Sequence, residues 1–212
     1  LFSDHFIHGI LNNTIDVASY QTLNQVDRQL ERSKLGIPAE SIVIGHVGRF
    51  SESKNQLFIL KLLHHLHQNG VNATAILVGD GPLKQKTEAE AERLGLTDVV
   101  HFPGIRGDVP KWMYLFDVFV FPSLFEGFGI AALEAQCAGT PCIVSDGVPT
   151  TVDVGLELVT NLSLEESIHK WTEAIRGAAA QQRLSLSVIH EFLFQNGFDV
   201  GHSVRQWEEL YM

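Results

Sequence analysis

The order of apolar and polar positions from residue 41 onward predicts an α/β fold. Short runs of apolar, largely β-branched residues alternate with longer stretches in which apolar residues recur at helical spacing. The predicted strands are 41–48, 73–81, 98–102, 117–123, 141–146 and, more weakly, 156–160. The predicted helices are 54–70, 82–95, 108–116, 129–138, 164–176 and 184–195. Strands joined by helical crossovers form a parallel sheet, so the pattern predicts a doubly wound, Rossmann-like architecture.

The two ends of the chain depart from this alternation. Residues 21–35 form a polar helical pattern before the first strand, and we expect that helix to be peripheral. Residues 199–212 predict a closing helix. The tract "RGAAAQQ" (176–182) is interpreted as a flexible joint between two helices.

Composition narrows the class of protein. The 212 residues are 45% hydrophobic and 19% charged, which is typical of a soluble globular protein. The formal net charge of −10 argues against a general nucleic-acid surface, because that binding needs Lys and Arg to neutralise phosphates. Any phosphate site must therefore be local, built from a few cations and backbone amides.

Other classes are excluded by what the sequence lacks. No apolar run approaches the roughly 20 residues of a membrane helix, and the N-terminus does not resemble a signal peptide, so we expect a cytosolic protein. Cys137 and Cys142 are too few for a disulfide framework or a zinc cluster, and we predict two buried reduced thiols. The chain begins with Leu1, and we expect it to be a piece of a longer protein.

The loops that follow the predicted strands are the candidate site. Ligands of open parallel sheets bind beyond the carboxyl ends of the strands, so these loops should meet at one edge. The five loops are "GHVGRFSESKN", "GDGP", "FPGIRGD", "SLFEGFGI" and "SDGVPT".

The first loop predicts a diphosphate site. Gly48 lets a ligand approach the backbone, and Arg49 and Lys54 bring two cations within six residues. Alternatively, both cations are solvated charges beside the start of a helix.

The loop after the fourth strand combines glycines with two carboxylates. A helix that begins near Gly129 would direct the amides of residues 128–131 to the ligand edge, and Gly127 and Gly129 would leave those amides uncovered. Glu126 and Glu134 would repel a phosphate, so we expect them to bind hydroxyl groups, because a carboxylate can accept from two vicinal hydroxyls at once, as an acidic residue does for ribose in dinucleotide-binding folds. The alternative is one glutamate in the turn before the helix and one solvated helical glutamate.

The histidines are weak candidates. "HHLH" (64–67) lies in a predicted helix without a thiol or carboxylate at ligand spacing, and we expect no metal there. His46 and His101 lie near the ligand edge, but a lone strand histidine is more often a structural hydrogen-bonding group.

Taken in order, these pieces resemble the family-4 glycosyltransferases with the GT-B fold, in their C-terminal nucleotide-sugar-binding domain. "GHVGRFSESKN", "ILVGDGP" and "VVHFPGIRGDVPKWMYLFDVFVFPSLFEGFGIAALEAQCAGTPCIVSD" cover about residues 41–146. The stretches "GRFSESKNQLF", "FPSLFEG", "EAQCAGTPCIVSD" and "LSLEES" are similar to the EpsF-type branch of exopolysaccharide and capsule assembly. Phe128 and Gly129 depart from residues common in that branch, and the match after residue 146 is loose.

The resemblance implies a role for each candidate residue. Arg49 and Lys54 would bind the diphosphate, Glu134 the ribose hydroxyls, and Glu126 the donor sugar at the reacting end. Residues on the glycine-rich turn would hold sugar hydroxyls and the distal phosphate through their backbone: Gly127, Phe128, Gly129, Ile130 and Ala131. The backbone at Ile105 and Arg106 resembles the loop that reads the base.

The resemblance also implies an activity and a domain organisation. It implies a retaining hexosyltransferase that uses no cofactor or metal, takes a nucleotide-diphosphate sugar, most simply a UDP-sugar, and transfers to a saccharide or lipid-linked acceptor. Residues 1–20, with "ILNNTID" (10–16), would be the tail of an N-terminal domain and its linker; 21–198 would be the donor-binding domain and 199–212 the closing helix. The acceptor would bind the N-terminal domain, so this chain alone should bind nucleotide without turnover. A lipid-linked acceptor would bring the intact enzyme to the inner face of the membrane.

Two other functions stay open on the sequence. A nucleotide-sugar epimerase of similar fold would change free sugar nucleotide without an acceptor. A non-catalytic binding or regulatory module would keep its nucleotide affinity when Glu134 is replaced by alanine.

Overall fold

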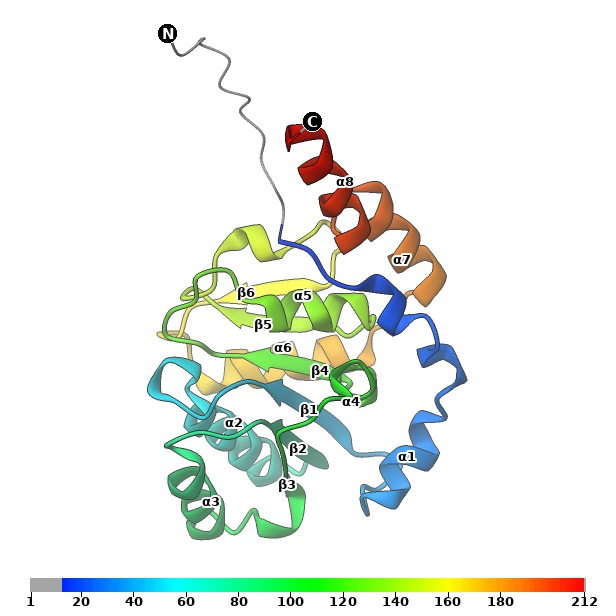
Figure 1. Ribbon diagram of the computed structural model, residues 1–212. Coiled ribbons are helices and arrows are strands. Elements are labelled where there is room, and N and C mark those ends of the chain that lie inside the picture. The colour runs from blue at the N-terminus through cyan, green and yellow to red at the C-terminus, as the bar shows by residue number, and fades with distance from the viewer. Residues whose placement is uncertain (1–12, 212) are drawn as a thin grey trace, which may run out of the picture.

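The computed structural model describes residues 13–211, and it contains one six-stranded parallel sheet (Figure 1). The strand order is β3-β2-β1-β4-β5-β6. The strands are β1 (Ile42–Val47), β2 (Ala73–Val78), β3 (Val100–Gly104), β4 (Val118–Phe121), β5 (Cys142–Ser145) and β6 (Val159–Leu162). The chain builds outward from β1 to β3, then returns to place β4 on the other side of β1. This confirms the predicted doubly wound sheet, in which the order of the parallel strands reverses between β1 and β4.

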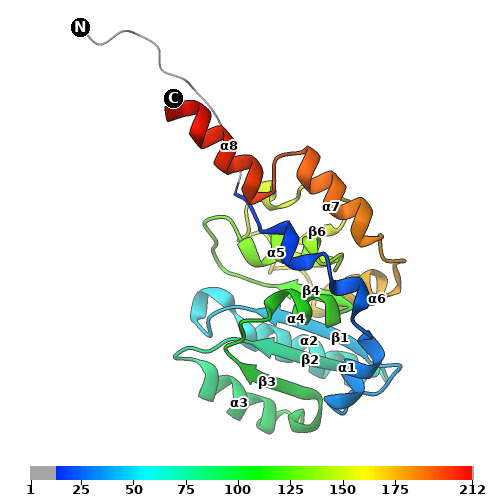
Figure 2. The same ribbon diagram turned by 45° about the vertical axis from the view of Figure 1, so that its right-hand side comes forward.

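Helices cover both faces of the sheet (Figure 2). They are α1 (Arg28–Lys34), α2 (Gln56–Gln68), α3 (Lys84–Arg93), α4 (Val109–Leu115), α5 (Ile130–Cys137), α6 (Ile168–Ala180), α7 (Leu186–Gln195) and α8 (Val200–Tyr211). Helices α2, α3 and α6 pack over one face, and α4, α5 and α7 pack over the other together with residues 15–23. Each predicted helix is present, with ends that differ by a few residues.

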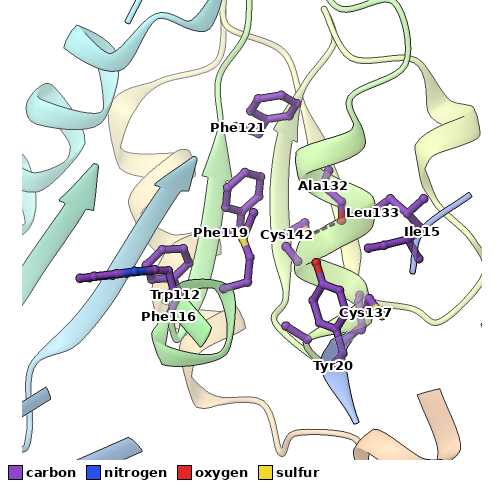
Figure 3. Close-up of a cluster of buried hydrophobic side chains, with 14 of the residues drawn as sticks. Ile15, Tyr20, Trp112, Phe116, Phe119, Phe121, Ala132, Leu133, Cys137 and Cys142 are labelled. Atoms are coloured by element: carbon purple, nitrogen blue, oxygen red, sulfur yellow. Dashed lines mark hydrogen bonds between the residues drawn. The ribbon is translucent and has the colours of Figure 1, made fainter. Parts of the chain in front are cut away.

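Strands buried on both faces explain why the sequence reads as short continuous apolar runs. β2, β4 and β5 are buried along their whole length, whereas β6, at the edge, is not. The cluster beneath α5 contains Phe119, Phe121 and both cysteines, as Figure 3 shows. Cys137 and Cys142 are buried free thiols, as predicted, and burial raises the pKa of both.

The helix predicted over 21–35 is shorter than expected but lies at the periphery, as predicted, since Arg32 is its one buried residue. Only Arg28–Lys34 is α-helical, with Asp27 accepting a hydrogen bond from the Leu30 N–H at the N-cap. The Arg32 side chain is buried and donates to Asp117 Oδ1 at 2.7 Å, and Arg28 donates to the same oxygen at 2.9 Å. These ion pairs tie α1 to the start of β4.

The flexible joint predicted at 176–182 is wrong over most of its length. Helix α6 continues to Ala180, and Ala178 packs into the core, because an alanine-rich stretch favours helix. β3 starts two residues later than predicted, after a 3₁₀ turn at Thr97–Val99, and β6 starts three residues later.

The described part of the predicted linker, residues 13–20, lies against the domain. Ile15 forms an isolated parallel bridge with Asp199, and the Ile15, Val17 and Tyr20 side chains are buried beside α5 and α7. The rest of the linker prediction, residues 1–12, lies outside the described residues.

Candidate functional site

The loops that follow β1 and β4 lie side by side at the carboxyl edge of the sheet. β1 pairs directly with β4, Ile44 opposite Val118. The Leu124 N–H donates to the Ser53 carbonyl at 2.7 Å, and Asn55 Nδ2 donates to the Pro122 carbonyl at 3.1 Å. The loops after β1 and β4, which contain the strongest candidate residues, therefore meet where the strand order of the sheet reverses.

Lys54 and Glu126 form an ion pair across this junction. Lys54 Nζ lies 2.6 Å from Glu126 Oε1 and 4.6 Å from the centroid of the Phe121 ring. Only 21% of the Lys54 side chain and 12% of the Glu126 side chain are exposed. Glu126 Oε2 accepts no hydrogen bond from the described residues. Each partner keeps hydrogen-bonding capacity for a ligand, since an ammonium has three donors and a carboxylate two oxygens.

The loop after β1 is fastened to the loop after β2 through glycines. The Gly48 N–H donates to the Val78 carbonyl at 3.0 Å, and the Phe50 N–H to the Asp80 carbonyl at 2.9 Å. Gly79 has φ +131°, and a Cβ there would lie 2.0 Å from the Gly48 oxygen. The motif "GDGP" thus serves the close approach of two loops.

Arg49 leaves this fastened loop toward solvent. The residue is exposed, and its guanidinium makes no hydrogen bond or ion pair with another described residue. Its donors are therefore open to an anionic ligand.

The N-terminus of α5 presents unpaired backbone donors. Gly129 is the N-cap, with φ +96° and no side-chain cap. Within the described chain, the N–H groups of residues 128–131 donate to no other atom. A Cβ at Gly129 would lie 3.2 Å from both Phe121 and Val148, so only glycine fits this turn without displacement. Free N–H groups at the positive end of a helix are an anion-binding arrangement.

Glu134 lies one turn into α5 and is half-buried. Its carboxylate has no hydrogen-bond or ion-pair partner among the described residues, and burial raises its pKa. A partly desolvated carboxylate without a partner is costly, so its position favours a ligand that supplies hydroxyl donors.

The Ile105–Arg106 segment stands apart from the other candidates. It follows β3, which lies two strands from β1 at the edge of the sheet. Ile105 is 80% exposed, and Arg106 donates to both oxygens of Asp108, at 2.9 and 3.2 Å. That ion pair lowers the pKa of Asp108, and the guanidinium lies 5.4 Å from the Trp112 ring. Among the described residues no hydrogen bond or ion pair joins this segment to Arg49 or Glu134.

His46 is a structural hydrogen-bonding residue, as expected. It is fully buried in β1, its Nδ1 lies 3.0 Å from the Val120 carbonyl, and burial lowers its pKa to about 4. Its Nε2 faces Gln56, which is also buried and which no sequence signal had singled out.

The "HHLH" histidines lie in α2, where His67 Nε2 is 2.8 Å from the Ala73 carbonyl oxygen. Among residues 13–211 no group of three or more His, Cys, Asp or Glu could hold a metal ion, and no helix is long and apolar enough to cross a membrane.

The strand order and the free helix N-terminus at the point where that order reverses define the class, a Rossmann-like domain. Residues 27–189 match the family model of the glycosyl transferases group 1, and the chain belongs to that family. It is 43% identical over 202 residues to a protein named putative glycosyltransferase EpsF from Bacillus subtilis (strain 168), covering 95% of this chain and 52% of that protein.

Two further comparisons agree. The chain is 32% identical over 150 residues to the Escherichia coli UDP-Gal:alpha-D-GlcNAc-diphosphoundecaprenol alpha-1,3-galactosyltransferase, covering 69% of this chain and 38% of that enzyme. Its fold is similar to Anabaena Alr3699/HepE solved in complex with UDP-glucose, with a TM-score of 0.79 and 24% identity over 96% of this chain and 57% of that one. The chain spans about half the length of these proteins or less.

Proposed function

We propose that this chain is the donor-binding domain of a retaining, metal-independent hexosyltransferase that uses a UDP-sugar in exopolysaccharide or capsule assembly. The observation that carries the proposal is the run of free N–H groups at residues 128–131, next to the Lys54–Glu126 pair and one turn before Glu134. Positive donors and an unpaired carboxylate within one short segment match the two chemistries of a sugar nucleotide, phosphate and vicinal hydroxyls.

In this proposal the diphosphate binds between the cations of the first loop and the start of α5. Arg49 contributes open donors, and Lys54 donates while it keeps its contact with Glu126. As the glycosidic bond to the phosphate breaks, charge grows on the leaving UDP. Preorganised cations and amides stabilise that charge most strongly in a site from which water is excluded.

The carboxylates take the hydroxyls of the donor. Glu134 accepts hydrogen bonds from the ribose, and Glu126 uses its free Oε2 toward the transferred sugar. The backbone of Gly48 and of residues 127–131 approaches the diphosphate and the sugar. Ile105 and Arg106 contact the base through their backbone, on a loop that must then lie within reach of the bound nucleotide.

Relatives support the choice of uridine diphosphate and of a sugar acceptor. The name of the E. coli relative specifies UDP-Gal and a diphosphoundecaprenol-linked acceptor, and HepE was solved with UDP-glucose. The acceptor of this enzyme is proposed to be a saccharide or a lipid-linked saccharide. It would bind an N-terminal domain joined through residues 1–20, and a lipid-linked acceptor would hold the enzyme at the inner face of the membrane.

Calorimetric titration of the chain with UDP, GDP and ADP, followed by their sugars, tests the proposal. We expect UDP to bind and Glu134→Ala to weaken that binding by about tenfold, since it removes hydrogen bonds from ribose to a charged group. Glu173→Ala, an exposed α6 glutamate on the other side of the sheet, is the control and should leave the affinity unchanged.

Absence of binding by all three nucleotides would refute the assignment of a donor site. The chain alone should transfer no sugar to saccharide acceptors, because the proposed acceptor domain is missing. Measurable transfer by the purified chain would contradict that second part.

A further inference from the structure

Two buried polar side chains connect the core of the sheet to the first loop of the candidate site. His46 is completely buried and Gln56 is 2% exposed. His46 Nδ1 lies 3.0 Å from the Val120 carbonyl oxygen in β4, and His46 Nε2 lies 3.3 Å from Gln56 Nε2. Gln56 Nε2 also lies 2.9 Å from the Arg49 carbonyl oxygen. The contacts form one continuous chain from β4 to the backbone of Arg49.

The partners determine every proton in this chain of contacts. A carbonyl oxygen only accepts, so His46 carries its proton on Nδ1 and Nε2 is left as an acceptor. The Arg49 carbonyl likewise requires the NH₂ end of Gln56, whose two hydrogens then serve Arg49 and His46. Neither side chain can reverse without leaving an acceptor facing an acceptor or a donor facing a donor.

The surroundings hold the His46 ring in place. The ring stacks on Phe119 at 6.0 Å and 8° and lies 5.8 Å from Phe121, two residues labelled in Figure 3. On the loop side, a Cβ at Gly48 would lie 3.2 Å from His46 Nε2. The absence of a side chain at Gly48 thus brings the loop backbone close to the ring.

Two apolar side chains could fill this part of the core without the free-energy cost of taking polar groups out of water. Buried polar groups offset that cost only when all of them are hydrogen-bonded. The hydrogen bonds of His46 and Gln56 end on a single loop carbonyl, that of Arg49. These hydrogen bonds therefore fix the backbone conformation of Arg49, whose side chain is proposed to bind the diphosphate.

We propose that His46 and Gln56 are positioning residues for the sugar-nucleotide diphosphate: neutral His46 orients Gln56, and Gln56 fixes the Arg49 backbone. The inference rests on the proposed function, because it assumes that Arg49 binds the diphosphate. It adds two residues that contact no ligand themselves.

The test compares UDP affinity in the 212-residue chain and in variants of it. Gln56→Leu should weaken UDP binding by about tenfold, the size expected for misplacing one charge-assisted hydrogen bond. Gln136→Leu is the matched control, since Gln136 is a fully buried glutamine in α5 whose Nε2 likewise has two partners, the carbonyl oxygens of Ala132 and Val152. Both variants should lower the unfolding temperature, and only Gln56→Leu should lower UDP affinity.

A double-mutant cycle separates positioning from a general loss of structure. Arg49→Ala should weaken UDP binding, and adding Gln56→Leu to Arg49→Ala should cause no further loss, because Gln56 acts through Arg49. Independent, additive losses would overturn the inference. Full UDP affinity in Gln56→Leu would overturn it as well and leave the proposed function intact, whereas absence of UDP binding by the unaltered chain would overturn both.

Nitrogen NMR of the His46 imidazole tests the geometry without any substitution. We expect a neutral ring at neutral pH with the proton on Nδ1. In Gln56→Leu the chemical shift of Nε2 should change, because this nitrogen no longer accepts a hydrogen bond. A proton on Nε2 in the unaltered chain would break the path to Arg49 and refute the proposal, even if Gln56→Leu fails to fold.

Discussion

Replacement of Asp117 by alanine should destabilise the domain strongly, because three donors depend on that carboxylate. Asp117 Oδ1 accepts from Arg28 Nη2 and Arg32 Nη2, and Oδ2 accepts from the Val43 N–H at 2.9 Å. The Arg32 side chain is only 5% exposed, so its charge cannot regain water without movement of α1. The variant leaves a buried guanidinium without its counter-ion.

The magnitude follows from that burial. Removing one partner of a buried ion pair costs about 3–5 kcal/mol. Arg32 also donates to the Leu115 carbonyl, which places the expected loss near the lower end, about 3 kcal/mol. For a domain of this size 1 kcal/mol corresponds to about 2–4 °C, so the unfolding temperature should fall by about 6–12 °C.

Urea and thermal unfolding followed by circular dichroism measure this loss. Glu166→Ala is the control, because it removes an exposed ion pair with Lys170 and should change the free energy of unfolding by about 0.5 kcal/mol or less. Arg32→Met combined with Asp117→Ala should be less destabilised than the sum of the single changes, since no buried charge is then left alone. A loss below about 1 kcal/mol in Asp117→Ala would refute the reasoning.

Three further outcomes are expected. Lys54→Met should weaken UDP binding by about 10- to 100-fold in calorimetry, since it removes a cation from the site and leaves Glu126 unpaired; unchanged affinity would exclude Lys54 from the diphosphate site. Burial raises the pKa of Glu134 above its unfolded value, so its contribution to stability is present at low pH and is lost as pH rises through the folded pKa. The unfolding temperature of Glu134→Gln, relative to that of the unaltered chain, should therefore be higher at about pH 7 than at about pH 4. An equal difference in unfolding temperature at both pH values would contradict this. Gly79→Ala should cost about 1–3 kcal/mol by urea unfolding, because φ is +131° and its Cβ would meet the Gly48 oxygen; Gly107→Ala, with open space around it, should cost less.

Much of the fold could be predicted from the sequence, because it depends on local periodicity. Fully buried parallel strands produce short apolar runs, and the crossover helices produce longer stretches with apolar residues at helical spacing. Both patterns can be recognised in the sequence before the packing of the elements is known. The free amides before α5 were also predictable, since Gly127 and Gly129 and the absence of a capping side chain lie within one short stretch. The errors fell at element ends and in the alanine-rich end of α6, where packing decides the boundary.

Only the tertiary structure decided which distant residues meet. Lys54 and Glu126 are 72 positions apart, and they pair because β1 and β4 are neighbouring strands of the sheet. Arg32 and Asp117 are 85 positions apart, and their ion pair fastens a polar, peripheral helix to the start of β4. Polarity and spacing in a sequence describe what a side chain can bond to, whereas strand order and register determine which partner lies within reach.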